Sequence, residues 1–119
     1  MIVAGFGFRG AASESSLRDA FARVGGKADA LAAPDDKAGA ECLIRLAQSL
    51  FLPILPICPK ALAQVQTVTH SAKVMAVRGV GSVAEAAALA GAGPAARLIC
   101  PRIVSGDRMA SAALAESGA

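Results

Sequence analysis

The chain has 119 residues, of which 55% are hydrophobic and 3% aromatic, and its formal net charge at pH 7 is +3. This length suits a single domain over residues 1–119, with a core of small side chains. The basic residues are scattered, and Trp and Tyr are absent, which argues against a nucleic-acid partner. No stretch approaches the roughly 18 apolar residues of a membrane span, and no basic leader precedes the first strand. We therefore expect a cytoplasmic protein with no membrane partner, whose positive charge suits an acidic ligand.

The first distinctive stretch is GFGFRG, residues 5–10, which satisfies the G-x-G-x-x-G pattern of dinucleotide-binding folds. A short apolar strand precedes it, as that pattern requires. However, Ser13 begins a run of helix-start residues, which leaves Gly10 outside the helix. Asp35 and Asp36 could serve as the acid that holds a ribose, at a slightly long spacing. We therefore expect no nucleotide cofactor, and we interpret the stretch as a loop whose backbone N–H groups can face an anion.

The segments after this loop alternate between helix and strand patterns. Helical spacing of apolar residues predicts a helix that starts near Ser13 and ends at Gly25-Gly26. A weak strand follows and stops at Pro34. The apolar face of a second helix is marked by Leu43, Ile44, Ala47, Leu50 and Phe51. The stretch PILPICP then predicts a strand at a sheet edge, because proline cannot donate a hydrogen bond. A helical turn is expected over 60–66 and a further helix in HSAKVMAVRGV.

The last third of the chain carries a helix signal followed by a hairpin signal. In GSVAEAAALAGAG, Ser82 and Glu85 form an S-x-x-E capping box, and Gly91 is expected to end the helix. Two apolar runs then flank Ser105-Gly106-Asp107, which predicts a hairpin with alternation in its second arm.

These patterns together predict an α/β fold, a three-layer α/β/α sandwich with a mixed sheet and a C-terminal β-hairpin. Its strands are expected near residues 2–8, 28–33, 53–58, 96–104 and 108–115.

The titratable and thiol side chains form no recognisable catalytic or metal-binding motif. The cysteines are Cys42, Cys58 and Cys100, with no C-x-x-C spacing, so we expect free thiols in a reducing compartment, with Cys100 in the core. His70 is the sole histidine, and no second histidine or cysteine stands at ligand spacing, so no metal site is expected. His70 beside Ser71 is either a general acid–base or a partner of a helix cap.

The order of these motifs resembles the CobE family and the homologous C-terminal domain of CbiG, both of cobalamin (vitamin B12) biosynthesis. The matching features are the GFGFR loop before a serine-started helix, DDK before the second helix, HS near the middle, GVGSVAEAAAL, and RLICPRIVSGDRMASAALA. Relatives of the CbiG type carry a loop similar to G-C-R-R-G-T. Here Phe8 replaces the cysteine and Gly10 the second arginine, so no role of those two residues is carried over. The chain looks like a stand-alone CobE and not a complete CbiG.

The resemblance implies a place in the conversion of precorrins to the corrin ring. CbiG-type proteins are associated with opening a lactone in a cobalt-precorrin. Two functions therefore stay open: a carrier that binds and passes on an anionic precorrin or other tetrapyrrole, and a hydrolase or lyase that acts on a precorrin lactone with His70 as base. The expected partners are this intermediate and other corrin-pathway enzymes.

Precorrins are flat macrocycles fringed with acetate and propionate groups, so their site needs helix N-termini, Arg or Lys donors and an apolar floor. The candidate ligand-binding residues are Gly5, Gly7, Arg9, Ser13, Lys37, Ser71 and Ser82. Arg9 is either a carboxylate clamp or a surface arginine. Lys37 either meets the ligand or pairs locally with Asp35 or Asp36. Helix capping alone accounts for Ser82 and Glu85.

Overall fold

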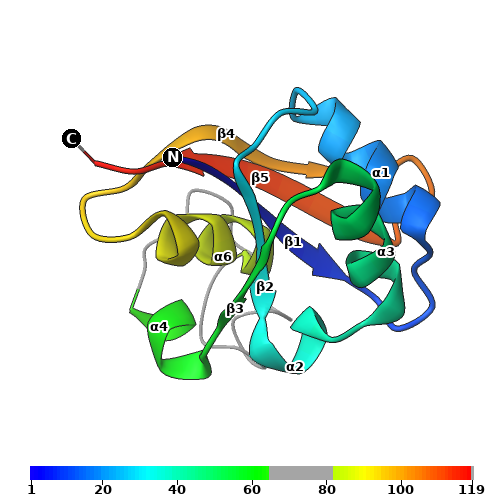
Figure 1. The fold of residues 1–119 in the computed structure, drawn as a ribbon, viewed down its shortest axis with the longest axis horizontal. Helices are drawn as coiled ribbons and strands as arrows, with labels where there is room; N and C mark the ends of the chain where they lie inside the picture. The colour runs from blue at the N-terminus through cyan, green and yellow to red at the C-terminus, as the bar shows by residue number, and fades with distance from the viewer. Residues whose placement is uncertain (65–81, 119) are drawn as a thin grey trace.

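The protein was analysed as a computed structural model that describes residues 1–64 and 82–118 (Figure 1). Within these residues one five-stranded sheet contains β1 (Ile2–Phe8), β2 (Ala30–Pro34), β3 (Ile54–Ile57), β4 (Arg97–Val104) and β5 (Ala110–Glu116). The described helices are α1 (Glu14–Arg23), α2 (Asp35–Ala38), α3 (Glu41–Leu50), α4 (Pro59–Ala63) and α6 (Val83–Ala92). The described part of the chain contains no helix long and apolar enough to cross a membrane.

The sheet has the strand order β3-β2-β1-β5-β4. Strands β1, β2 and β3 are parallel, whereas β5 runs antiparallel to both β1 and β4. Helices α1 and α3 cover one face, and α4 and α6 cover the other (Figure 1). The predicted three-layer sandwich with a mixed sheet and a closing hairpin is confirmed, and every predicted strand is present with each end within two residues of its expected position.

The two faces of the sheet are packed differently. On the α1–α3 face the core is built from larger side chains, among them Phe6, Leu17, Phe21, Leu31, Leu43 and Leu46. On the α6 face it is mostly alanine, with Ala32, Ala86, Ala87, Ala88, Ala92 and Ala115 packed around Val3, Ile57 and Leu62. Small side chains bring the backbones of α6 and the sheet close together, so this layer is thin.

Gly5 is where α6 comes closest to the sheet. A Cβ atom on Gly5 would lie 2.1 Å from the carbonyl oxygen of Ala84 and 2.4 Å from the backbone nitrogen of Ala88. Gly91 meets the sheet in the same way, since its Cβ would lie 3.0 Å from Val3 and 3.1 Å from Ala32. The prediction that Gly91 ends the helix is therefore wrong. The helix runs on to Ala92 and ends at Gly93, whose φ of +97° suits glycine.

Two further sequence expectations fail for reasons of tertiary structure. The expected alternation in the second arm of the hairpin is absent, because α1 and α6 cover opposite faces of β5 and its residues from Ala112 to Ala115 are all buried. Phe51 was expected on the buried face of the second helix. That helix ends at Leu50, and Phe51 lies in the left-handed region with its side chain 93% exposed.

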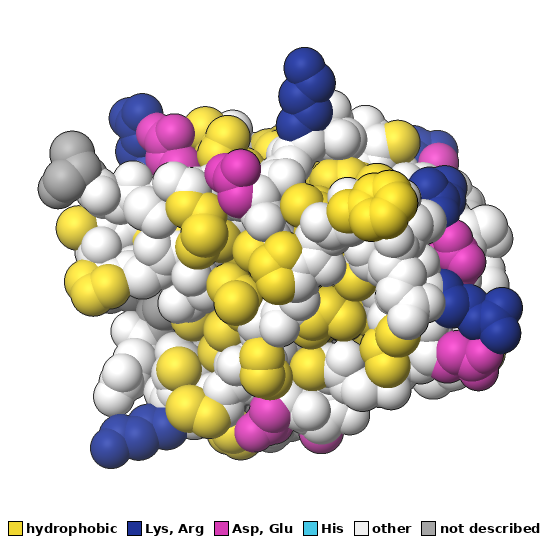
Figure 2. Space-filling model, viewed as in Figure 1, with side chains coloured by type: hydrophobic (Ala, Val, Ile, Leu, Met, Phe, Trp, Pro, Cys, Tyr) yellow, Lys and Arg dark blue, Asp and Glu magenta, His cyan; other side chains and the backbone are white. Residues whose placement is uncertain are grey.

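The exposed edge of the sheet at β3 is protected by proline. Residue pairs Leu31–Ile54 and Ala33–Pro56 define the parallel register, and the N–H of Leu31 donates to the carbonyl of Pro53. In a parallel ladder alternate residues face the neighbouring strand, so Pro56 stands where the backbone faces outward. The missing N–H removes a donor from the free edge, which discourages pairing with another strand. Figure 2 shows hydrophobic side chains gathered over this region, where such protection matters most.

The packing of α6 predicts effects of very different size at two glycines. Gly5→Ala should lower the free energy of unfolding by about 3 kcal/mol or more, because the added methyl group meets helix backbone that cannot move aside. Gly10→Ala is the matched control, since no atom lies within 4 Å of its Cβ position, and its effect should stay within about 1 kcal/mol. Urea unfolding followed by circular dichroism measures both. Equal stability of the two variants would show that α6 does not press on Gly5.

Candidate functional site

An open groove of about 1020 Å³ lies at the carboxyl ends of β1 and β2, between the first turns of α1 and α3; we call it the α1–α3 groove. In parallel α/β sheets, the chain leaves the strands at this edge and helix N-termini gather there, so ligands commonly bind there. Phe8, from the end of β1, supplies an apolar side chain to the lining. Ser13 and Lys37 line it as well, from the loop before α1 and from α2.

The helix N-termini at the groove are capped differently. At α1, the Ser13 hydroxyl accepts from the N–H of Ser16, and the Ser16 hydroxyl accepts from the N–H of Ser13, a complete capping box. The predicted helix start at Ser13, with Gly10 outside the helix, is confirmed. At α3, the N-cap residue is Ala40, which has no side chain that can accept a hydrogen bond. The first N–H groups of α3 therefore lack a side-chain cap beside the groove.

The charged side chains that line the groove are balanced. Arg18 donates to Glu14 at 2.5 Å and to Ser49 of α3 at 2.8 Å, and Arg45 pairs with Glu41. Figure 2 shows basic and acidic side chains alternating along the side of the molecule where α1 and α3 lie. Both arginine–glutamate pairs are largely exposed, so each pair is weak and easily exchanged.

Lys37 has a different partner from the arginines. Its Nζ lies 5.3 Å from the centroid of the Phe8 ring, a cation–π arrangement. Among the described residues it has no carboxylate within ion-pair distance, so the expected local pairing with Asp35 or Asp36 is not formed there. Lys37 is therefore a cation held over an apolar surface inside the groove.

The structure divides the other sequence candidates between the two faces of the sheet. Arg9 is exposed and stands between two groove-lining residues, and its guanidinium has no partner in the described parts of the chain. Gly5 and Gly7 lie inside β1, where they face α6 and not the groove. Both glycines therefore pack against α6, and they lie within the strand and not in the loop that follows it. A ligand-binding role for them stays a prediction. Ser71 and the candidate base His70 lie outside the described residues.

Ser82 and Glu85 form a fully buried pair at the start of α6. The Ser82 hydroxyl accepts from the N–H of Glu85 at 3.3 Å, so its predicted capping role is confirmed. The Glu85 carboxylate accepts from the N–H of Arg102 at 2.9 Å, at an irregularity in β4 where an extra residue breaks the ladder with β5. Ser82 thus caps α6, whereas Glu85 reaches β4 and holds the helix to the sheet. Burial also raises the pKa of the Cys100 thiol, which is half-buried on β4.

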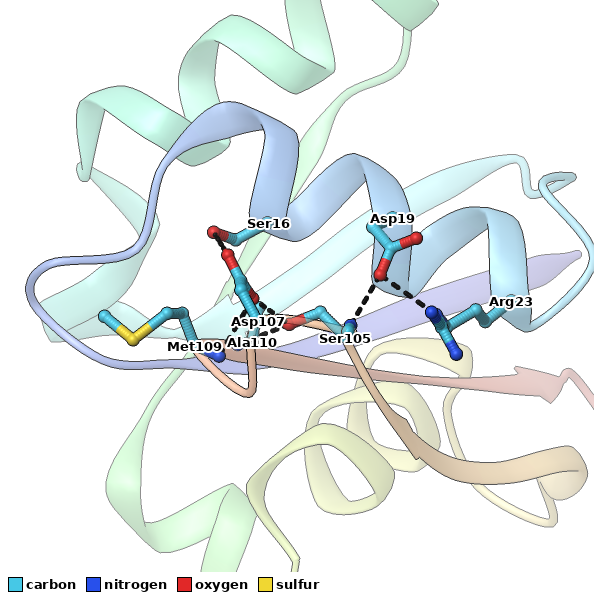
Figure 3. A network of polar contacts seen from close by, with 8 residues as sticks. Ser16, Asp19, Arg23, Ser105, Asp107, Met109 and Ala110 are labelled. Atoms are coloured by element: carbon cyan, nitrogen blue, oxygen red, sulfur yellow. Dashed lines mark hydrogen bonds and ion pairs between the residues drawn. The ribbon is translucent and has the colours of Figure 1, made fainter.

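Sequence patterns gave no sign of a polar network that joins α1 to the tip of the β4–β5 hairpin (Figure 3). The carboxylate of Asp107 accepts from the hydroxyls of Ser16 and Ser105, each at 2.5 Å. One turn further along α1, Asp19 accepts from the N–H of Gly106 at 2.7 Å and from Arg23 at 2.9 Å. Helix start and hairpin turn were each expected, but their contact across 91 positions of sequence was not.

Proteins of known family are similar to this chain in sequence and in fold. A family model described as "Cobalamin synthesis G C-terminus" matches residues 2–115. CobE, a protein from the cobalamin (vitamin B12) biosynthetic pathway, has a solved structure that superposes with a TM-score of 0.86 at 34% identity, covering 97% of this chain and 92% of that chain. The cobalamin biosynthesis protein chiG from Agrobacterium tumefaciens str. C58 gives a TM-score of 0.74 at 32% identity, covering 100% of both chains.

A putative cobalamin biosynthesis protein G homolog from Sulfolobus solfataricus shares the fold, with a TM-score of 0.72 at 18% identity. The match covers 98% of this chain but 37% of that chain. A comparison with curated protein sequences gave no significant match.

The mixed sheet, its two helical layers and the groove define a class: a three-layer α/β/α domain with an open groove at the carboxyl edge of its parallel strands. Within that class, the chain belongs to the family of the CbiG C-terminal domain, and it is a protein of cobalamin biosynthesis.

The α1–hairpin network predicts a loss of stability in acid. Hydrogen bonds from Ser105, Ser16 and the N–H of Met109 hold the pKa of Asp107 below its ordinary value. The N–H of Gly106, followed by Arg23, does the same for the pKa of Asp19. Because these pKa values are lowered on folding, the stabilisation is complete above the unfolded value of about 3.9 and is lost as the pH falls through the folded values.

The urea midpoint should accordingly stay level from pH 7 to about pH 5 and then fall as the pH is lowered through about 3.9 and below. In a variant that carries both Asp19→Asn and Asp107→Asn the decline should be shallower. An unchanged slope in that variant would mean that neither carboxylate contributes to the acid sensitivity.

Proposed function

We propose that this protein binds an anionic tetrapyrrole intermediate of the cobalamin pathway in the α1–α3 groove. Intermediates between the first tetrapyrrole and the corrin ring are broad, partly apolar macrocycles with a fringe of carboxylates. A site for such a ligand needs an open cavity, an apolar surface for the ring and donors for the carboxylates. The groove offers all three within one edge of the sheet.

The observation that carries the proposal is Lys37 held over the Phe8 ring beside the uncapped start of α3. An ammonium over an aromatic face can swing aside to meet a carboxylate and leave the ring exposed to an apolar macrocycle. The free N–H groups of the first turn of α3 add donors, and the helix dipole favours negative charge there. A flat ligand with acidic edges matches this combination better than a small inorganic anion would.

The arginines at the groove set how an acidic ligand is received. Arg18 and Arg45 are each partnered by a glutamate on their own helix. A ligand carboxylate must take the place of that glutamate, and an exposed pair of this kind is worth at most about 1 kcal/mol. The exchange therefore costs little, and neither of these two arginines is left unpaired when the groove is empty.

The side chains that line the groove favour binding over catalysis. The described lining includes one thiol, that of Cys42, and no histidine. We infer that the chain acts as a carrier, which holds a labile intermediate and passes it to another enzyme of the pathway. A turnover assay with purified precorrin separates this role from that of a hydrolase or lyase: a carrier leaves the mass of the precorrin unchanged.

Removal of the groove lysine should weaken tetrapyrrole binding. Lys37→Ala deletes a charge-assisted contact worth about 1.5–3 kcal/mol, so the dissociation constant should rise about 10- to 100-fold. Uroporphyrin, a stable porphyrin with the same acetate and propionate fringe, serves as the probe in a fluorescence titration. Lys27→Ala is the matched control, because Lys27 is exposed on the turn between α1 and β2, at the opposite edge of the sheet. Equal weakening of binding by both substitutions would show that the net charge of the protein, and not a contact in the groove, is responsible.

Substitutions of Arg9 test whether the rim of the groove contributes to ligand binding. Arg9→Ala should weaken uroporphyrin binding by about 10-fold or more, and Arg9→Lys should fall between the wild type and Ala because it keeps the charge but loses the planar fork. Added salt should weaken the wild type more than the Ala variant, since screening acts on the remaining charge. The same affinity in all three proteins would leave Arg9 as an ordinary surface arginine.

A further inference from the structure

One wall of the α1–α3 groove is formed by the segment from Arg9 to Ser13, which includes the lining residues Gly10, Ala12 and Ser13. Inside this segment the N–H of Ala12 donates to the carbonyl of Arg9 at 3.0 Å. Its first residue is held from outside, because the N–H of Arg9 donates to the carbonyl of Met109 at 2.9 Å. Met109 belongs to the turn between β4 and β5. The start of the wall is thus fixed by the hairpin.

The end of the wall is fixed by the same turn through a hydroxyl group. Ser16 is buried, and its single hydroxyl proton is donated to Asp107 at 2.5 Å. Its oxygen is then left as an acceptor, and it receives the N–H of Ser13 at 3.2 Å. The N–H of Ser16 in turn donates to the Ser13 hydroxyl at 3.3 Å. Asp107 therefore holds in place the Ser16 hydroxyl, whose oxygen is one of the two acceptors in the capping box that ends the wall.

Asp107 is itself held in place by the hairpin. The Ser105 hydroxyl donates to one carboxylate oxygen at 2.5 Å, and the N–H of Met109 donates to the same oxygen at 3.0 Å. Ser105 also accepts from the N–H of Ala110 at 3.1 Å, which ties it to the start of β5. Figure 3 shows these contacts converging on the carboxylate between the turn and α1. These donors fix the orientation of the Asp107 carboxylate, and the carboxylate in turn fixes the Ser16 hydroxyl that donates to it.

We infer that Asp107 is a positioning residue for the α1–α3 groove, which holds the Arg9–Ser13 wall through Ser16 in the conformation that receives an anionic ligand. Its role in ligand binding rests on the proposed function, whereas its hold on the wall does not. Asp107 is not among the groove-lining residues, so it acts through the capping box and not by contact with the ligand.

The test compares Asp107→Ala and Ser16→Ala with Asp19→Ala. Asp19 also joins α1 to the same turn by a carboxylate hydrogen bond, but its described contacts are with Gly106 and Arg23 and not with the capping box. All variants are compared under conditions in which their unfolding curves show that they are folded. Asp107→Ala and Ser16→Ala should weaken uroporphyrin binding about 3- to 10-fold, as expected for one lost hydrogen bond, whereas Asp19→Ala should leave it unchanged.

Amide hydrogen exchange without ligand gives a second readout. Exchange at residues 10–13 should be faster in Asp107→Ala than in Asp19→Ala, although both lose a tie between α1 and the hairpin. Asp107→Asn should restore part of the protection and part of the affinity, because its amide oxygen still accepts one hydroxyl proton. If Asp107→Ala does not fold, Asp107→Asn and Ser16→Ala carry the comparison.

The two proposals can fail separately. If the wild type does not bind uroporphyrin, binding in the groove is refuted, while faster exchange confined to Asp107→Ala and Ser16→Ala still supports the positioning role. If the wild type binds, but Asp107→Ala and Asp19→Ala match each other in affinity and in exchange at residues 10–13, the positioning role is overturned.

Discussion

The close seating of α6 on β1 is the contact on which the rest of this structure depends. Gly5 permits it, since any side chain there would run into the helix backbone at Ala84 and Ala88. Once the helix lies this near, its sheet-facing positions must be small, which accounts for the alanine core of that layer. The start of α6 is also drawn into the interior, where Ser82 and Glu85 satisfy backbone groups that water cannot reach. Two of the three glycines in a pattern that looks like a ligand loop, Gly5 and Gly7, thereby serve packing.

The opposite face is organised by polar contacts between distant parts of the chain. The loop between β1 and α1 lies near the start of the sequence. The turn before β5, near the end of the sequence, nevertheless holds both ends of this loop. Strand pairing makes this possible, because β5 lies beside β1 and the antiparallel register places Ala110 opposite Phe8. The hairpin turn consequently arrives at the carboxyl edge of the parallel strands. The last elements of the chain complete a site that the first elements begin.

The groove formed there is nearly neutral, although the protein is basic. Its arginines are balanced by glutamates one helical turn away, while Lys37 lies over Phe8. Such a surface does not attract every anion equally. A ligand gains from it when it brings both carboxylates and an apolar face, because the carboxylates exchange with the glutamates and the apolar face covers the ring. These features are the reason for proposing a tetrapyrrole as the ligand of this groove.

The sequence by itself determined the five strands and their order along the chain, the start of α1 and the hairpin turn. Hydrophobic runs, the serine before α1 and the turn residues at Ser105-Gly106-Asp107 act locally, so strands, helix starts and the hairpin could be predicted without knowledge of the fold. The family was also recognisable from motif order, and the groove residues Ser13 and Lys37 were among the candidates. Local patterns are informative here because capping and turn formation depend on neighbours in the chain.

Tertiary structure alone decided which face each candidate serves. Gly5 and Gly7 belong to the α6 interface because side chains alternate along β1. β5 is buried on both faces because α1 packs on one face and α6 on the other, so its pattern could not alternate. Gly91 lies within α6 since the sheet, and not the helix end, demands a small residue there. The Asp107–Ser16 contact joins residues 91 positions apart, and no local pattern encodes such a distance, because the strand order that brings the two together is a property of the whole sheet.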